Sequence, residues 1–272
     1  MPSTYYKVSA PITADFNMEY YMNLEERITA AQVFTPHVHD VLELYILLEG
    51  DTSFVVEHSL YRLSPGDIVI SKPNEMHNCI LNSASTHKHL CLWFDPSCDF
   101  LFSDFLAHDF GSGNVCRPTP EDFEMIRQIC MALHRASKEG KDKQDEFRLA
   151  VDLLYYIRRN LDADERSETL PPLLHKILAD INNDLTSINS LSYFTDKYFI
   201  SASTLSRLFR KHLRTSPKVY METKRLAYAR ILLKRGMSVA DACAEAGFPD
   251  YSNFIRLFRT RFGVTPLQYR NS

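Results

Sequence analysis

The 272-residue chain is 45% apolar and 24% charged, a composition typical of a globular protein with room for two domains. No apolar run approaches the roughly 20 residues of a membrane-spanning helix, and the first residues lack the apolar core of a signal peptide. The six cysteines are scattered and form no Cys-x-x-Cys pair. These features exclude a membrane protein and a disulfide scaffold, and they predict a cytoplasmic protein with reduced thiols.

The net charge of −3 conceals two regions of opposite sign. From Pro171 onward there are 16 Lys and Arg against 7 Asp and Glu, whereas the preceding residues have 15 against 27. An acidic first part and a basic second part indicate that only the second part meets a polyanion such as DNA.

Residues 33–95 contain short apolar runs at 41–48, 52–57, 68–70 and 90–94, separated by turn signals such as Pro65-Gly66-Asp67. Many short strands with this punctuation predict a β-sandwich or a closed barrel. Strand alternation places His37, His39, Glu43 and Tyr45 on one face. If that face points into a barrel, these polar side chains line a small interior.

The spacing His37-x-His39-x3-Glu43, followed by Gly66-Asp67 and Pro73-x3-His77, resembles the two motifs of the cupin fold. In metal cupins, three His and one Glu at these positions hold a divalent ion, and these residue types suit Fe, Mn, Ni or Zn. The second motif departs from the pattern, because Glu75 replaces its usual Gly. Three uses remain open for this face: a metal site, a small-molecule pocket, which is favoured, or a polar network that satisfies the barrel mouth. The predicted pocket consists of His37, His39, Glu43, Tyr45, His77 and Trp93, and the predicted metal ligands are His37, His39, Glu43 and His77.

Two amphipathic helices are predicted after the barrel. The first runs from about residue 119 to Gly140, with its apolar stripe at Phe123, Ile126, Ile129, Cys130 and Leu133. The second has Phe147, Ala150, Val151, Leu154 and Ile157 on one face. The first is expected to pack on its own barrel, whereas the second, over residues 145–161, is the candidate homodimer interface. Residues 162–172 are polar and end in Pro-Pro, which predicts a linker.

The basic part contains an internal repeat at an offset of 49 residues. Arg207-Leu-Phe-Arg210 matches Arg256-Leu-Phe-Arg259, Ser216-Pro217 matches Thr265-Pro266, and Tyr220 matches Tyr269. Each copy predicts a helix, a turn and a second helix that begins at a capping residue, Ser201 or Asp250. Ser216 and Thr265 are predicted to cap a further helix with Pro at its first position. A helix over 217–235 connects the copies. At about 28 Å it is long enough to hold two recognition helices about one DNA turn apart.

This pair resembles the bipartite DNA-binding domain of the AraC/XylS family of bacterial transcription regulators. The signature is closest in Ala246-Gly-Phe-x-Asp-x-Ser-x-Phe-x-Arg-x-Phe258 and in Phe262-Gly-Val-Thr-Pro266, and weaker in the first copy. By position, the resemblance implies base contacts from Ser203, Ser206, Arg207, Tyr251, Ser252 and Arg256. It implies phosphate contacts from Arg210, Lys211, Arg214, Arg259 and Arg261.

The expected fold class is α+β: a cupin-like jelly-roll barrel with two following helices, and an all-α domain of two helix-turn-helix units joined by a long helix. The expected divisions are 1–116 for the barrel, 117–161 for the dimerisation helices, 162–172 for the linker and 173–272 for the DNA-binding domain. Within the last, the helix-turn-helix units are expected at about 188–213 and 238–262.

The function implied is a transcription regulator, not an enzyme. Its expected partners are double-stranded DNA, a small effector for which a sugar is the leading class, a second copy of the chain, and RNA polymerase if it activates. No cofactor is required, although the cupin residues allow a divalent metal. Two alternatives are a metal-dependent cupin enzyme and a regulator switched by a protein partner or by pH through the histidines.

Overall fold

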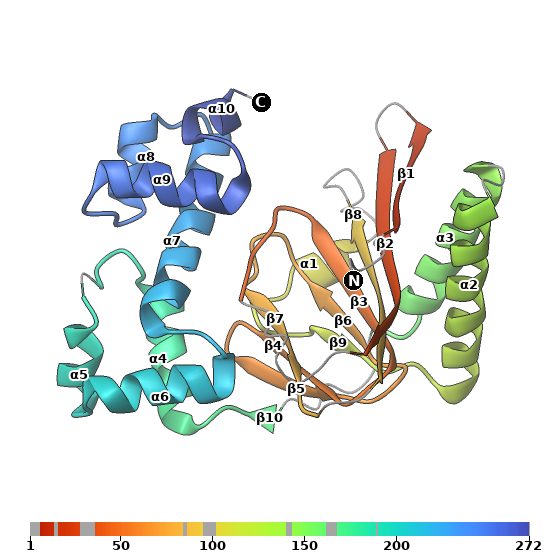
Figure 1. The fold of residues 1–272 in the computed structure, drawn as a ribbon, viewed down its shortest axis with the longest axis horizontal. Helices are drawn as coiled ribbons and strands as arrows, with labels where there is room; N and C mark the ends of the chain where they lie inside the picture. The colour runs from red at the N-terminus through yellow and green to blue at the C-terminus, as the bar shows by residue number, and fades with distance from the viewer. Residues whose placement is uncertain are drawn as a thin grey trace. The chain divides into compact units, whose positions relative to one another are not determined.

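A computed structural model of the chain describes residues 6–13, 16–27, 36–83, 86–94, 102–139, 143–161, 168–188 and 190–271. The chain divides into two compact units, with the main boundary between Glu168 and Thr169. The first unit is rich in strands and the second is helical (Figure 1). No helix of the described part is long and apolar enough to cross a membrane.

The first unit contains two antiparallel sheets. The six-stranded sheet has the order β1-β2-β8-β3-β6-β9 and the four-stranded sheet the order β10-β5-β4-β7. The bounds are β1 Tyr6–Thr13, β2 Phe16–Arg27, β3 Leu42–Glu49, β4 Thr52–Val56, β5 Ser59–Leu63, β6 Ile68–Ser71, β7 His77–Leu81, β8 Thr86–Phe94, β9 Val115–Cys116 and β10 Glu168–Thr169.

A core shared by the two sheets makes this a sandwich of the jelly-roll type, as the sequence predicts. It includes Tyr45 from β3, Phe54 from β4, Tyr61 from β5 and Cys79 from β7. Strand alternation is the cause, because Tyr45 and Leu47 point inward while Leu44 and Ile46 point to the opposite face. β1 and β2 were not predicted from the sequence, and β10 lies within the predicted linker.

The outer face of the six-stranded sheet is covered by α2, Pro120–Glu139, and α3, Lys143–Arg158 (Figure 1). The stripe predicted for the first helix is largely confirmed, because Ile126, Ile129, Cys130 and Leu133 join this core. The face predicted for the second helix is partly wrong. Ala150, Leu153 and Ile157 are buried, whereas Val151 is 46% exposed. The apolar residues of α3 extend around more than one face, so periodicity did not fix which face meets the sheet.

The second unit consists of seven short and medium helices within residues 168–188 and 190–271. Their bounds are α4 Pro172–Asn183, α5 Ser192–Tyr198, α6 Ala202–Leu213, α7 Pro217–Lys234, α8 Val239–Glu245, α9 Tyr251–Phe262 and α10 Pro266–Arg270. In the first unit, the remaining helix is the short α1, Ser103–Leu106. α4 was not predicted from the sequence, and α7 ends at Lys234, one residue before the predicted end at 235.

All four predicted capping residues are confirmed. Ser201, Ser216, Asp250 and Thr265 each accept a hydrogen bond from the backbone N–H three residues on. Such a bond satisfies one of the N–H groups that a helix leaves unpaired at its start. Thr265 also shares a reciprocal pair of bonds with Gln268. The repeat in the sequence is therefore a repeat of helix starts.

Candidate DNA interface and effector site

The first helix-turn-helix unit consists of α5, a three-residue connection over 199–201 and α6. Leu205, Phe209 and Leu213 form the buried face of α6, and Phe209 packs edge-on against Tyr220 of α7 with 5.6 Å between ring centroids. The opposite face therefore points to solvent. It carries the predicted base readers Ser203, Ser206 and Arg207 and the predicted phosphate ligands Arg210, Lys211 and Arg214. All of these are exposed except Ser206, which is half-buried.

The second helix-turn-helix unit consists of α8, a five-residue connection over 246–250 and α9. Phe254 and Phe258 of α9 are fully buried beside Ala242 and Cys243 of α8, whose small side chains let the two helices approach closely. The predicted readers Tyr251, Ser252 and Arg256 and the predicted phosphate ligand Arg259 are exposed on the other face. Arg261 differs, because its side chain is half-buried and burial, followed by the nearby charge of Arg230, lowers its pKa.

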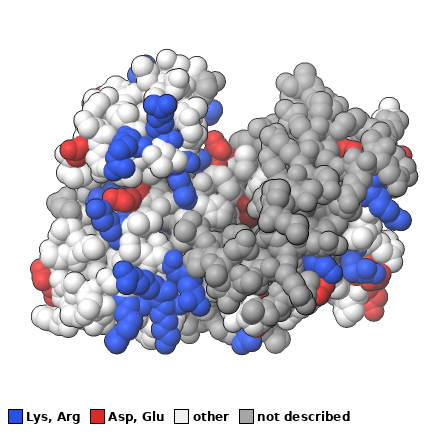
Figure 2. Space-filling view, in the orientation of Figure 1, with Lys and Arg blue, Asp and Glu red and all other residues white. Residues whose placement is uncertain are grey.

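Basic side chains gather on the helical half of the molecule in two groups, one at the level of α6 and one at the level of α9 (Figure 2). The last turn of α6 supplies Arg210, Lys211 and His212, and the last turn of α9 supplies Arg259 and Arg261. Two exposed recognition helices with cationic ends match the requirements of a surface that follows a DNA backbone.

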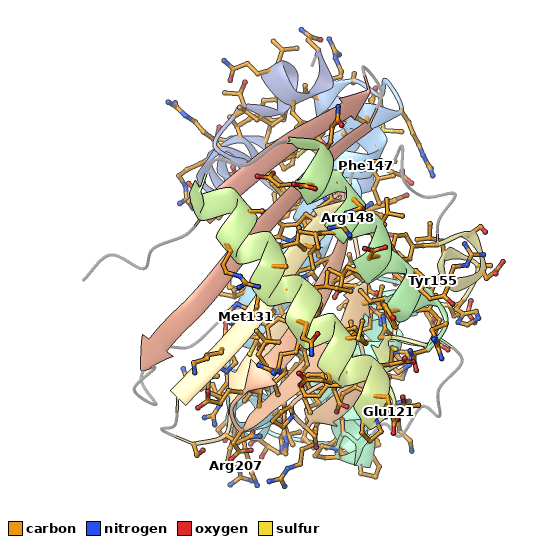
Figure 3. All side chains as sticks on the ribbon, turned by 90° about the vertical axis from the view of Figure 1, so that its right-hand side faces the viewer. Glu121, Met131, Phe147, Arg148, Tyr155 and Arg207 are labelled. Carbon is orange, nitrogen blue, oxygen red and sulfur yellow. The ribbon has the colours of Figure 1, made fainter. Side chains whose placement is uncertain are left out.

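The outer face of α2 and α3 is partly apolar (Figure 3). Val151 and Tyr155 stand one turn apart on α3 and are 46% and 62% exposed, and Met131 of α2 is 38% exposed. The Tyr155 ring also lies edge-on to Tyr156, with 5.4 Å between their centroids. Val151 and Tyr155 lie within residues 145–161, the predicted homodimer interface, whereas Met131 lies outside that range.

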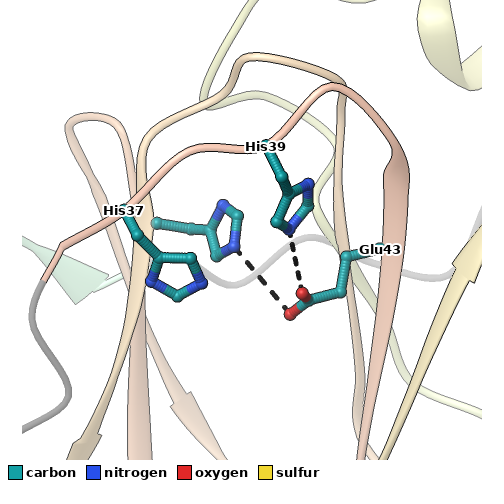
Figure 4. Close-up of side chains that lie close together, drawn as sticks. His37, His39 and Glu43 are labelled. Carbon is teal, nitrogen blue, oxygen red and sulfur yellow. Dashed lines mark hydrogen bonds and ion pairs between the residues drawn. The ribbon is translucent and has the colours of Figure 1, made fainter. Parts of the chain in front are cut away.

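One end of the sandwich interior holds a cluster of imidazole and carboxylate groups (Figure 4). His37, His39, Glu43 and His77 each offer one ligand atom, and these atoms all lie within 4.8 Å of one another. Glu43 comes from β3 and His77 from the first position of β7, so sheet packing brings together residues that are far apart in sequence. The predicted set of metal-type residues is therefore assembled in space.

Two hydrogen bonds fix which nitrogen of each ring faces Glu43. His39 Nδ1 lies 2.9 Å from the Val41 carbonyl oxygen, and His77 Nδ1 lies 2.9 Å from the Glu75 carbonyl oxygen. Because a carbonyl oxygen can only accept, each Nδ1 must carry the proton and donate it. In a neutral ring, Nε2 then has a lone pair and no proton. His39 Nε2 lies 2.9 Å from one Glu43 oxygen, and His77 Nε2 lies 3.9 Å from the other.

Lone pairs on imidazole nitrogens that face a carboxylate repel it unless a positive charge lies between them. Protons on the rings or a metal ion would supply that charge. Locking Nδ1 to a backbone carbonyl is also the usual way in which proteins orient histidine ligands. The arrangement therefore fits a cation. Trp93 Nε1 donates a further hydrogen bond to Glu43, so Trp93 joins the cluster as predicted.

Tyr45, the remaining predicted pocket residue, has different partners. Its hydroxyl pairs with His87 Nε2 at 3.0 Å and with Cys79 Sγ at 3.7 Å, and His87 Nδ1 pairs with Thr52. His89 stacks on the Tyr45 ring at 4.9 Å. Burial lowers the pKa of His87 to about 4, and burial together with His87 lowers the pKa of His89 to about 4, so both rings are neutral at pH 7.

The sequence predicted Trp93 for this pocket but not His87, His89 or Cys91, which belong to the same row on β8. Their alternation along β8 was the available signal, since it places four polar or aromatic side chains in one row facing Glu43 and Tyr45 of β3. Solvent reaches part of this inner row, because His89, Cys91 and Trp93 are half-buried whereas Leu90, Leu92 and Phe94 on the outer side are fully buried.

Glu75, which departs from the cupin pattern, holds together three chain segments near the cluster. Its carboxylate accepts hydrogen bonds from the backbone of Lys72, the backbone of Gly111 and the Asn114 amide. Burial raises the pKa of Glu75 to about 7 despite these bonds. Its carbonyl orients His77, so the substitution of the usual Gly is compatible with the ligand geometry.

A β-sandwich with a polar interior and a domain of two exposed recognition helices define a DNA-binding regulator with an effector-binding domain. The AraC-like ligand binding domain model matches residues 19–157, and a helix-turn-helix domain model matches residues 194–272. The chain belongs to the AraC family of transcription regulators.

The chain also matches transcription regulators over most of their length. The chain is 27% identical to the uncharacterized HTH-type transcriptional regulator YbfI of Bacillus subtilis, over 82% of each chain. It is 25% identical to the transcriptional activator RhaR of Escherichia coli, over 88% of each chain. Among solved structures, ToxT of Vibrio cholerae with a bound unsaturated fatty acid matches 94% of each chain at 14% identity, with a TM-score of 0.37.

Proposed function

We propose that the two recognition helices read adjacent major-groove segments of one operator. In this proposal Ser203, Ser206 and Arg207 of α6, and Tyr251, Ser252 and Arg256 of α9, contact base edges. The supporting observation is that each set lies on the face of its helix opposite the buried phenylalanines. Arg pairs with guanine O6 and N7, whereas Ser contacts are less selective.

The experiment is selection of an operator from random DNA by the purified chain, followed by binding measurements on single-base variants. Arg207→Ala and Arg256→Ala should each relax the base preference within one half of the operator. If both variants keep the full preference, the assigned readers are wrong. If the parent chain selects no sequence at all, sequence-specific regulation itself is contradicted.

We also propose that the effector is bound inside the sandwich, beside Glu43. Hydroxyl groups of a sugar could donate to the carboxylate, which makes a sugar one candidate class. A divalent cation is the second candidate, and the specific observation in its favour is the convergence of His39 Nε2 and His77 Nε2 on Glu43. His37, His39, Glu43 and His77 would hold the ion, which would supply a fixed positive charge that binds oxygen or nitrogen groups of a further ligand.

Trp93 provides the measurement, because it is the single tryptophan of the chain and donates a hydrogen bond to Glu43. Chelator-treated protein would be titrated with Zn²⁺, Mn²⁺, Ni²⁺ and Fe²⁺, and separately with a panel of sugars, while tryptophan fluorescence and DNA binding are followed. Metal binding should saturate at one ion per chain and be lost in Glu43→Gln and His77→Ala. His175→Ala, at an exposed site on α4, is the matched control.

A saturable response to a sugar but to none of the metals would assign the site to the sugar. A response of DNA binding to neither class would contradict an effector of these kinds and leave the alternative of a protein partner. The function proposed is regulatory rather than enzymatic, and it would take place in the cytoplasm, with RNA polymerase as a partner if the chain activates transcription.

We propose a homodimer that uses the exposed face of residues 145–161. The supporting observation is that Val151 and Tyr155 present apolar surface one turn apart on α3. Tyr155→Glu should convert the dimer to monomer in light scattering, whereas Arg148→Ala, at an exposed charged site on the same helix, should not. A monomeric parent chain would contradict this interface.

A further inference from the structure

The outer face of α9 carries a short chain of hydrogen bonds at successive helical turns. Asp250 caps the helix by accepting from the Asn253 backbone N–H at 2.6 Å. The side-chain oxygen of Asn253 then accepts from Arg256 Nη2, also at 2.6 Å. Residues three apart on a helix lie side by side, so this contact needs no distortion of either side chain.

The contact defines the direction of a guanidinium that otherwise has many rotamers. A free arginine must give up most of this rotamer freedom when it pairs with a base. A side chain already held near its bound geometry loses less and discriminates better, because displacement from the guanine edge is opposed by the partner that holds it. The Arg256 side chain is exposed, so its remaining N–H groups are accessible to DNA.

In the first helix-turn-helix unit, the arginine equivalent to Arg256 has no asparagine partner. At the offset of 49 residues, Thr204 stands where Asn253 stands and Arg207 stands where Arg256 stands. The Thr204 hydroxyl pairs with the Ser201 hydroxyl at 2.9 Å, toward the start of α6 and away from Arg207. Within the residues that the structure describes, Arg207 makes no hydrogen bond or ion pair.

We propose that Asn253 is a positioning residue that orients Arg256 for base recognition and makes the operator half read by α9 the more stringent half. The inference rests on the proposed role of Arg256 as a base reader. It predicts that Asn253 acts through Arg256 and not by contacting DNA itself.

The test uses the full chain and the operator selected with it. In Asn253→Ala, discrimination at the base read by Arg256 should fall about threefold to tenfold, as expected when an arginine loses its orienting partner. Affinity for non-specific DNA and the salt dependence should stay unchanged, since no phosphate contact is removed. The helix cap should persist, because Asp250 accepts from the backbone of residue 253 and not from its side chain.

A double-mutant cycle separates positioning from direct contact. Once Arg256→Ala is present, Asn253→Ala should have no further effect, because there is no guanidinium left to orient. An equal loss in both backgrounds would overturn the proposal and assign Asn253 a DNA contact of its own. If Arg256→Ala alone leaves base preference intact, the reader assignment fails, which is a different result from the failure of the positioning role.

The first helix-turn-helix unit allows the reverse experiment, in which an orienting partner is added to Arg207. Thr204→Asn recreates the pair at the same helical spacing and should raise discrimination at the base read by Arg207, whereas Thr204→Val should not. Thr204 is half-buried and its backbone N–H is capped by Ser201, so both variants retain the helix start. No gain from Thr204→Asn, together with no loss from Asn253→Ala, would overturn the inference.

Discussion

The two helix-turn-helix units have the same order of helices, but their turns differ in length and in the residue that takes a positive φ. Each turn has one residue in the left-handed region, Phe199 in the first unit and Gly247 in the second. Each recognition helix also ends in this region, at Arg214 in α6 and at Gly263 in α9. Glycine adopts this conformation freely, whereas other residues pay about 1 kcal/mol or more. The second unit is thus locally relaxed and the first is not.

The surroundings of the turn residues also differ. A Cβ at Gly247 would lie 3.3 Å from Arg225 Nε, a close contact, and 3.5 Å from the Thr186 backbone, an ordinary one, so the positive φ is the main reason for glycine here. Phe199 is 95% exposed. The same helix-turn-helix arrangement therefore forms with either residue type at the positive-φ position, an exposed phenylalanine in one turn and a glycine in the other.

The largest expected effect is the loss of selective DNA affinity when the base-reading arginine of either helix-turn-helix unit is removed. Arg207→Ala and Arg256→Ala should each reduce selective affinity by about 1–3 kcal/mol, roughly tenfold to a hundredfold, if each arginine pairs with a guanine. Competition binding at one fixed salt concentration measures the loss. Arg210→Ala is the control, which should weaken all sequences alike and reduce the salt slope by about one. A uniform loss in Arg207→Ala would place that side chain on phosphate instead.

Removal of the caps should have the next largest effect. Ser201→Ala and Asp250→Ala should each lower the free energy of unfolding of the helical unit by about 1 kcal/mol, because each leaves a backbone N–H unpaired at the start of a recognition helix. Denaturant titration of the full chain, followed by helical circular dichroism, measures the decrease. Ser201→Asp should retain most of the stability. Equal stability of Ser201→Ala and the parent would show that solvent replaces this cap.

Glycine exchange at the helix ends tests the strain directly. Arg214→Gly should raise stability by about 1 kcal/mol and Gly263→Ala should lower it by a similar amount, since both sites take positive φ and Gly263 has open space around it. Thermal unfolding of the two variants measures opposite shifts in Tm. Arg214→Gly should also weaken DNA binding if Arg214 contacts phosphate. A Tm decrease in Arg214→Gly would mean that this side chain stabilises the fold more than the backbone strain destabilises it.

The smallest effect concerns a contact between α4 and the first helix of the first helix-turn-helix unit. Asp180 of α4 accepts hydrogen bonds from Lys197 and from the Tyr198 hydroxyl of α5, at 2.9 and 2.8 Å. Asp180→Asn should lower Tm least of all these variants, and less so at high salt, because exposed ion pairs are weak and screened. A salt-independent decrease would assign the effect to the tyrosine bond.

Much of the helical unit was predictable, and the reason is that its signals are local. The capping residues, the proline positions and the phenylalanine spacing act within one or two turns of a helix, so the repeat at offset 49 located α5 to α10 closely. The exception is α4, which has no counterpart in the repeat. In the strand-rich unit, the buried face of α3 was predicted only in part, because several apolar residues compete and packing on the sheet selects among them.

The effector site was predicted only in part. The motif identified His37, His39, Glu43 and His77, which the sandwich does bring together. It gave no information on the partner of Tyr45, because the Tyr45–His87 pair depends on how β3 and β8 align across the sheet. Nor does the motif reveal the orientation of His39 and His77, which two backbone carbonyls impose.

The sequence alone located the starts of α6, α7, α9 and α10, the buried faces of α6 and α9, and the duplication of the helix-turn-helix unit, because these depend on neighbours a few residues away. The packing of distant segments makes two imidazole Nε2 atoms converge on Glu43 and makes α3 bury Leu153 in place of Val151. The pair between Arg256 and Asn253 is local to α9, but residue spacing alone does not show that it forms. Those features depend on the packing of distant segments or on side-chain geometry, which residue spacing does not specify.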